Sequence, residues 1–382
     1  MNQEGLLGWY EKLEKLVSKL PGPLQKAILS ELQPVKELFL EQRPARILLT
    51  GTNDVSRVEI VNSLFREQII PLGDENPLPI VPGWETFRRV AGGSVLLLDA
   101  RGQTTLHWGS GREFFPPDLV LFTCQSDSDP EALQLAITAL AQTLVEIENQ
   151  FDQRPAVFGV LEGNVAEGDP APRRTTEEVA LENSLRANLT VNKSLAGVQS
   201  ISRWSRFRAD GTPDESNDGL TALLTTLVDE LPTQAKLEMA RISGVRPAQR
   251  KIAQTLIKAT TAVSAAIGAQ PIPLADMPIL TALQLSMVAG IIYISGGELN
   301  MRSGVKFLGS LGFTIGIGLA LRETARGVAK LVPGFGYAVS GAVAAGGTMA
   351  VGRAATAFFI DGLTLGETKN IFRRKQKSLE GK

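Results

Sequence analysis

The segment from Arg46 to Phe65, RILLTGTNDVSRVEIVNSLF, constrains the fold of this 382-residue chain more than any other part. A short apolar run, Arg46–Thr50, leads through Gly51 into an amphipathic stretch, Arg57–Phe65. A strand followed by glycine and a helix is the setting of a phosphate-binding loop, whose pattern is G-x-x-x-x-G-K-[ST]. The segment therefore predicts a P-loop-type α/β domain.

The residues that give such a loop its chemistry are mostly replaced. Ser56, Arg57 and Val58 stand where the second Gly, the Lys and the Ser/Thr belong. In a working loop the Gly lets N–H groups wrap the phosphates, the Lys neutralises them and the hydroxyl holds Mg²⁺. Arginine can also bind phosphate, although its fork is larger than an ammonium group. The loop therefore predicts lost turnover and leaves nucleotide binding open.

Strands and helices alternate along residues 45–231. This order predicts a mostly parallel sheet with helices on both faces. The predicted strands are Arg46–Thr50, Ser94–Asp99, Asp118–Cys124, Ala156–Leu161 and Val198–Ser202. The predicted helices are Arg57–Phe65, Pro130–Asn149, Thr175–Leu189 and Asn217–Leu231.

The length of the chain indicates more than one domain. We expect an N-terminal helical hairpin over residues 1–44, the α/β domain over 45–231 and an all-α Gly-rich helical domain over 232–382. The net charge of −1 and the lack of a basic patch with interleaved aromatics predict no nucleic-acid partner. The single cysteine, Cys124, excludes a disulfide framework and fits a cytosolic protein.

Two segments carry a resemblance to a known family. Gly51–Leu64 holds Asn53, Val55, Asn62 and Leu64 where Era-type (TrmE/Era-type) bacterial GTPases usually have them, and the strand Ser94–Asp99 ends in D-x-x-G followed by Gln103. The resemblance implies that Asp99 holds Mg²⁺, that the Gly102 N–H senses the terminal phosphate, and that Gln103 positions the attacking water. On the residues alone, a turn capped by Asp99 and closed by Gly102 explains the same segment.

The family's guanine-reading motif, N-K-x-D, is missing from its expected place. Residues 162–165 after the Ala156–Leu161 strand read Glu-Gly-Asn-Val, and Asn164 is most simply a turn residue. Thr86 is the candidate for the switch-region threonine. The resemblance implies GTP and Mg²⁺ as the possible cofactors, with Asp99 as the metal-binding residue and Gln103 as the catalytic residue if the site is active. The nucleotide-binding candidates are Gly51, Asn53, Asp54, Val55, Ser56, Arg57, Val58, Asp99 and Gly102.

The Gly-rich region carries three apolar segments, Ile279–Gly296, Val305–Leu321 and Leu331–Ile360. Their length and the G-x-x-x-G step at Gly312–Gly316 favour membrane association, while the polar residues within them suit a tightly packed soluble bundle. The region resembles the uncharacterised helical domain that follows Era-like G domains in many bacterial proteins, which is often described as membrane-associated. The implied partner is membrane lipid or a membrane protein.

Taken together, the sequence predicts a non-catalytic, GTPase-like (pseudo-GTPase) scaffold or adaptor at the cytoplasmic side of a membrane. The first alternative is a GTPase with an unusual loop, in which Arg57 binds phosphate and Gln103 positions water. The second is a transport or pore-type membrane component. A soluble cytoplasmic location, a protein partner and a homo-oligomer also stay open.

Overall fold

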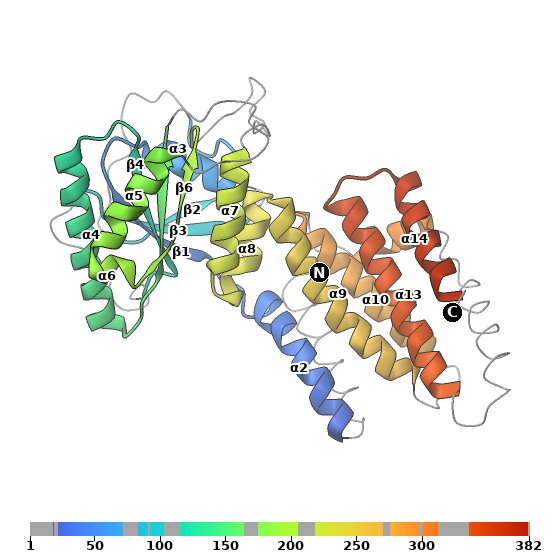
Figure 1. Cartoon of the computed structure of the whole chain (residues 1–382). Helices are drawn as coiled ribbons and strands as arrows, with labels where there is room; N and C mark the ends of the chain where they lie inside the picture. Colours follow the sequence, from blue (N-terminus) through green and yellow to red (C-terminus); the bar gives the residue numbers. More distant parts are fainter. Residues whose placement is uncertain are drawn as a thin grey trace. The chain divides into compact units, whose positions relative to one another are not determined.

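A computed structural model of the chain describes residues 18, 22–71, 83–90, 92–102, 115–163, 175–204, 218–269, 276–297, 301–311 and 336–380. The chain forms two compact units, each with its own core (Figure 1). An α/β unit comprises Arg43–Val245, and a helical unit comprises Met1–Gln42 together with Arg246–Lys382.

The α/β unit contains one six-stranded sheet in the order β2-β3-β1-β4-β5-β6. Neighbouring strands are parallel except β2, which pairs antiparallel with β3 at the edge. This confirms the predicted mostly parallel α/β class. The predicted strands are present, and β2 is an element that the sequence did not predict as a strand. The strands are β1 (Ala45–Gly51), β2 (Glu85–Arg88), β3 (Ser94–Asp99), β4 (Leu119–Gln125), β5 (Ala156–Glu162) and β6 (Leu195–Ile201).

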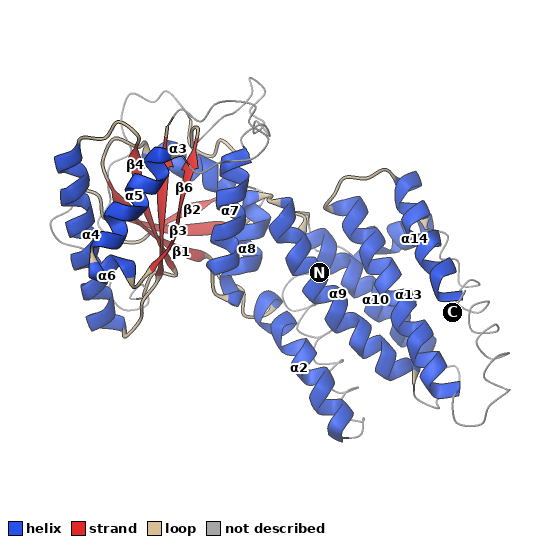
Figure 2. Ribbon diagram, viewed as in Figure 1, coloured by secondary structure: helices blue, strands red, loops and turns tan. Residues whose placement is uncertain are grey.

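Helices cover both faces of this sheet (Figure 2). On one face, residues of α4, α5 and α6 form a continuous core with strand residues such as Leu48, Val120 and Val157. On the other, α8 packs on β1 and β3, and α3 packs on α8. The helices are α3 (Arg57–Phe65), α4 (Pro130–Phe151), α5 (Thr176–Ala187), α6 (Leu189–Asn192), α7 (Asp218–Glu230) and α8 (Thr233–Ser243).

The central strand β1 lies at the point where the strand order reverses. Its neighbours are β3 on one side and β4 on the other, and all three run in the same direction. In open α/β sheets, ligands bind outside the carboxyl ends of the strands at such a switch point. The loop after Gly51, the end of β3 at Asp99 and the end of β4 therefore mark the place where a site is expected.

The helical unit consists of α2 (Gly22–Phe39), α9 (Arg246–Gly268), α10 (Asp276–Ile294), α11 (Met301–Ser310), α13 (Gly336–Phe359) and α14 (Leu365–Glu380). The apolar helices α10 and α13 pack against each other and against α9. A chain of neutral polar groups joins them: the Gln284 amide donates to Thr348 Oγ1 at 3.1 Å, and that hydroxyl donates to Ser264 Oγ at 2.9 Å. Among the described residues, no helix is both long and apolar enough to cross a membrane.

Glycines let α9 and α13 approach closely. A Cβ at Gly341 would lie 2.8 Å from the Ala265 carbonyl oxygen, and one at Gly352 would lie 2.6 Å from the Ile257 side chain. Both distances are shorter than an ordinary contact, so the helices meet at these positions only because the side chains are absent. Gly341 and Gly352 thus allow close packing of α13 on α9.

The compact units differ from the three expected domains. Helix α8 belongs to the α/β unit, because its side chains Leu237, Met239 and Ile242 are buried there, which moves the boundary from 231/232 to 245/246. Residues 1–44 do not form a separate unit: α2 packs on α9, and Phe39 lies against Tyr293 of α10. The first predicted helix of the N-terminal hairpin lies outside the described residues.

Candidate functional site

The loop after β1 is fixed to the neighbouring strand β4. Gly51 has φ +114°, and a Cβ there would lie 2.0 Å from the Thr123 carbonyl oxygen, so only glycine fits. The next residue, Thr52, donates its backbone N–H to the same carbonyl at 2.9 Å. The sequence-predicted glycine therefore makes the tight exit from the strand that a phosphate loop needs.

A carboxylate lies inside this loop. Asp54 accepts hydrogen bonds from the hydroxyls of Thr52 and of Ser128, which follows β4. The Gln125 side chain also donates to the Asp54 carbonyl oxygen at 3.1 Å. These bonds fix the loop to the end of β4 and place a negative charge where a phosphate loop binds anions, which opposes phosphate binding.

Helix α3 begins without a metal-binding hydroxyl. Ser56 is its N-cap, and the Oγ of Ser56 accepts from the Glu59 N–H at 3.4 Å. Val58 occupies the position at which a Ser or Thr would coordinate Mg²⁺. The one hydroxyl near the helix start is thus used to cap the helix.

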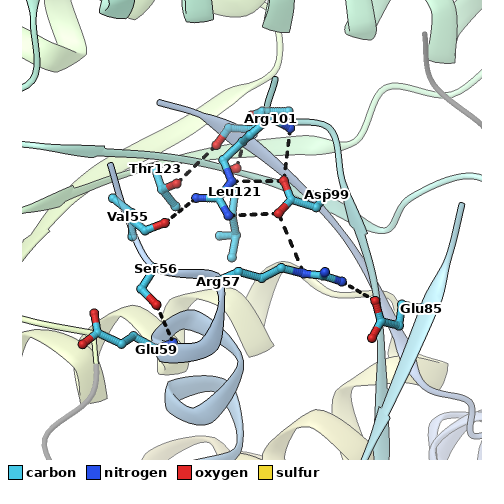
Figure 3. Close-up of polar contacts among 10 residues, drawn as sticks. Val55, Ser56, Arg57, Glu59, Glu85, Asp99, Arg101, Leu121 and Thr123 are labelled. Atoms are coloured by element: carbon cyan, nitrogen blue, oxygen red, sulfur yellow. Dashed lines mark hydrogen bonds and ion pairs between the residues drawn. The ribbon is translucent and has the colours of Figure 1, made fainter. Parts of the chain in front are cut away.

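Arg57 points to the sheet edge rather than remaining free for an anion (Figure 3). Its guanidinium forms an ion pair with Glu85 of β2, and its Nε lies 3.8 Å from Asp99 Oδ2. The guanidinium carbon also lies 5.5 Å from the centre of the Phe87 ring. With 8% of its surface exposed, Arg57 is a buried partner in an internal charge cluster.

The carboxylate of Asp99 is held on both oxygens by Arg101 (Figure 3). Arg101 Nε donates to Asp99 Oδ1 at 3.0 Å and Nη2 donates to Oδ2 at 2.9 Å, a bidentate arrangement. The Arg101 backbone N–H adds a bond to Oδ1 at 3.1 Å. Asp99 is only 1% exposed, so its lone pairs face protein donors instead of solvent.

Arg101 also reaches the phosphate loop. Its Nη1 donates to the Val55 carbonyl oxygen at 2.7 Å, which joins the end of β3 to the start of α3. The cluster therefore contains two guanidinium groups and two carboxylates, Arg57 and Arg101 with Asp99 and Glu85. Sequence reasoning missed Arg101 and Glu85 as site residues, because Arg101 occupies an unspecified position of D-x-x-G and Glu85 lies on the strand that was not predicted.

Some of the remaining residues that the sequence analysis considered lie among the described residues, and others do not. Gly102 has φ +67°, and a Cβ there would lie 2.9 Å from Asn53 Nδ2, so these two residues lie together beside the cluster. Thr86 lies on β2 and is exposed. Gln103 and Asn164 lie outside the described residues.

The end of β5, where the guanine-reading motif was expected, holds a buried acid. The Glu162 carboxylate accepts a hydrogen bond from the backbone N–H of Trp204 at 3.4 Å. The Ser63 hydroxyl of α3 donates to the backbone carbonyl oxygen of Trp204. Trp204 is fully buried. Burial, followed by the nearby charge of Glu59, raises the pKa of Glu162. Trp204 therefore occupies the space between α3 and the end of β5, and sequence reasoning did not identify it.

Cys124, at the end of β4, is buried. Burial, with a smaller contribution from the charge of Asp54, raises the pKa of its thiol to about 12. A thiol with that pKa is almost wholly protonated at neutral pH and is a poor nucleophile. This cysteine therefore does not supply the site with reactive chemistry.

Comparisons with known proteins give matches to solved structures but not to protein families. No protein-family model and no curated protein sequence matches the chain. A solved structure that matches is described by the words "Dimerization is important for the GTPase activity of chloroplast translocon components atToc33 and psToc159". The identity is 15% and the TM-score 0.33, with 56% of this chain and 92% of that chain covered. The assignment of a P-loop, GTPase-like α/β fold rests on the strand order and on the loop after β1.

Proposed function

We propose that the α/β unit is a pseudo-GTPase domain, which keeps the GTPase-like fold without turning over GTP. The chain would then act as a non-catalytic scaffold or adaptor at the cytoplasmic side of a membrane. The observation that carries the first part is the bidentate ion pair between Arg101 and Asp99, the residue that the family resemblance assigns to Mg²⁺. Arg57 is likewise ion-paired, with Glu85.

Opening this site for Mg²⁺ and a nucleotide would be costly. A metal at Asp99 must displace Arg101, whose side chain is also buried. Breaking a buried ion pair so that one charge is left without its partner costs about 3–5 kcal/mol. Val58 offers no hydroxyl to the metal in return, and Arg57 would have to leave Glu85 to reach a phosphate. The geometry thus supports loss of Mg²⁺-dependent hydrolysis more strongly than any other function.

Calorimetric titration of the full chain with GTP and with GDP, each with and without Mg²⁺, tests this proposal. We expect no saturable heat with either nucleotide and no release of phosphate from GTP. Micromolar, Mg²⁺-dependent binding that disappears in Asp99→Ala would overturn it and favour the GTPase with an unusual loop. Arg154→Ala, which alters an exposed ion pair with Glu148 in the same unit, is the matched control.

The membrane location is supported by the sequence of the helical unit. Gly312 and Gly316 form the small-residue step described above, and basic residues flank the Gly-rich region at both ends, over 241–251 and 373–377. Fractionation of cells with a carbonate wash tests it. A protein recovered wholly in the soluble fraction, before and after lowering the salt concentration of the lysate, would contradict the membrane part and leave the pseudo-GTPase part standing.

A further inference from the structure

Charge is divided unequally between the two units. The helical unit carries 21 Lys and Arg residues against 12 Asp and Glu, a net charge of +9. The α/β unit carries 18 against 28, a net charge of −10. The overall net charge of −1 hides this separation. Charge asymmetry between the parts of a chain is typical of proteins that contact a charged surface.

Seven of the basic residues of the helical unit lie on helices that contain no acid. Helices α9, α11 and α13 have no Asp or Glu in their sequences. Every Lys and Arg on them is exposed to solvent, and Arg250 also forms an ion pair with Asp361. The seven basic residues are Arg246, Arg250, Lys251, Lys258, Arg302, Lys306 and Arg353.

Helix α11 also exposes an apolar side chain beside its basic residues. Val305 is 54% exposed, and the exposed Arg302 and Lys306 lie within one helical turn of it. The other surface is anchored, because Phe307 is buried and packs against the rings of Phe358 and Phe359. A helix held by one face that offers basic and apolar side chains on the other fits the boundary between lipid headgroups and acyl chains.

We propose that the exposed basic side chains of α9 and α11 bind an anionic lipid surface. This inference rests on the membrane part of the proposed function and adds the class of lipid and the residues that bind it. Basic residues near an anionic bilayer are attracted to it within about one Debye length, roughly 8 Å at physiological salt. Val305 adds apolar contact that a purely electrostatic partner would not use. The α/β unit, with its net charge of −10, is repelled by the same surface.

Flotation of the full chain with lipid vesicles tests the proposal. We expect co-flotation with phosphatidylcholine vesicles that contain phosphatidylserine, none with phosphatidylcholine alone, and release as salt is raised. The double variant Arg302→Glu/Lys306→Glu should lower the partition coefficient by about 30-fold or more, since each basic residue at the surface contributes about 1 kcal/mol. Lys251→Glu/Lys258→Glu should do the same on α9.

Arg88→Glu/Lys193→Glu makes the same change in net charge on exposed residues of the α/β unit and is the matched control. We expect it to bind vesicles as the wild type does. Equal binding to neutral and anionic vesicles, an equal loss in the control, or preference for a nucleic-acid competitor over the anionic vesicles would overturn the proposal. Retention in the cellular membrane fraction without binding to anionic vesicles would overturn the lipid assignment alone, and the membrane part of the proposed function would stand.

Discussion

The two units bury polar groups of different kinds. The α/β unit buries charge: Asp99 and Arg101 form an ion pair at the ends of the strands, with Arg57 and Glu85 beside them. The helical unit buries neutral groups, the linked side chains of Gln284, Thr348 and Ser264. Buried ions are expensive unless they are fully paired, whereas neutral hydrogen-bonded groups cost less.

The charged groups of the two units lie in different places, at the sheet in one and on the surface in the other. The buried charges lie at the switch point of a parallel sheet, the place where a P-loop fold binds its ligand, and they form ion pairs with one another there. In the helical unit, by contrast, the basic residues of α9 and α11 are exposed, and these two helices have no acidic residues. On the proposals above, the first unit no longer binds a ligand at this place, and the second contacts an anionic membrane surface through its exposed basic residues.

The largest expected effect is from breaking the buried ion pair. Arg101→Ala should lower the free energy of unfolding of the α/β unit by about 3–5 kcal/mol, because Asp99 is left buried without its bidentate partner. Urea denaturation measures this. Arg154→Ala removes an exposed ion pair and should leave the transition where it is. An equally small effect at both positions would show that the Asp99 cluster is not held together as the contacts indicate.

The contact between α9 and α13 in the helical unit predicts the next change in stability. Gly341→Ala should destabilise the helical unit by about 1–3 kcal/mol, since the added methyl group meets the Ala265 carbonyl oxygen. Gly347 lies on the same helix with nothing within 4 Å of an added Cβ. Gly347→Ala should therefore stabilise the helix by about 0.5–1 kcal/mol. Thermal unfolding should separate the two variants in opposite directions, and a shift of the same sign would count against close packing of α9 on α13.

The hydrogen-bonded groups of Gln284, Thr348 and Ser264 predict a similar loss of stability. Thr348→Val should cost about 1–3 kcal/mol, because it leaves the buried Gln284 amide without its acceptor. Thr356→Val on the same helix removes a hydroxyl bonded only to the Gly352 carbonyl oxygen, which keeps its place in the helix, and should cost less. If the two variants unfold at the same urea concentration, the hydrogen bonds of Thr348 do not contribute to the packing of α9, α10 and α13.

We expect a smaller change in how the free energy of unfolding depends on pH. Burial raises the pKa of Glu162 above its value in the unfolded chain, so the native state binds the proton more tightly. Stability therefore falls as pH rises from the unfolded pKa through the raised native pKa, and this loss persists above it. Glu162→Gln should remove that dependence. Denaturation curves of both proteins across the acidic range measure it, and an unchanged slope in Glu162→Gln would assign the pH dependence to other groups.

Much of the α/β unit could be predicted from local patterns, and much of the site could not. The apolar strands and the exit at Gly51 follow from hydrophobic runs and a glycine. The engagement of Asp99 by Arg101, and of Arg57 by Glu85, depends on side-chain direction and on the edge strand β2, which is too short at four residues to show a clear alternation. A pattern such as D-x-x-G gives no weight to the residue in its third position, which is Arg101 here.

In the helical unit, too, local sequence patterns do not predict contacts between residues that are far apart in the sequence. The apolar segments Ile279–Gly296 and Leu331–Ile360 favoured membrane helices on sequence length, and periodicity alone does not distinguish such segments from buried helices. Neither α10 nor α13, the described helices that form there, is both long and apolar enough to cross a membrane. Their packing on α9 depends on contacts between residues far apart in sequence, such as Gln284 with Thr348 and Gly341 with Ala265. The placement of α2 on α9 joins the two ends of the chain in one unit, which no local pattern indicates.

The most direct test of the closed site is to observe its two arginines in the presence of nucleotide. Side-chain NMR of Arg57 and Arg101 should show Nε–H protons that exchange slowly with water, as expected for buried guanidinium groups. Addition of GTP and Mg²⁺ should leave both resonances unchanged. Shifts of both resonances on addition of GTP and Mg²⁺, absent with Mg²⁺ alone, would contradict the account, because they would show that the ion pairs open to admit a nucleotide.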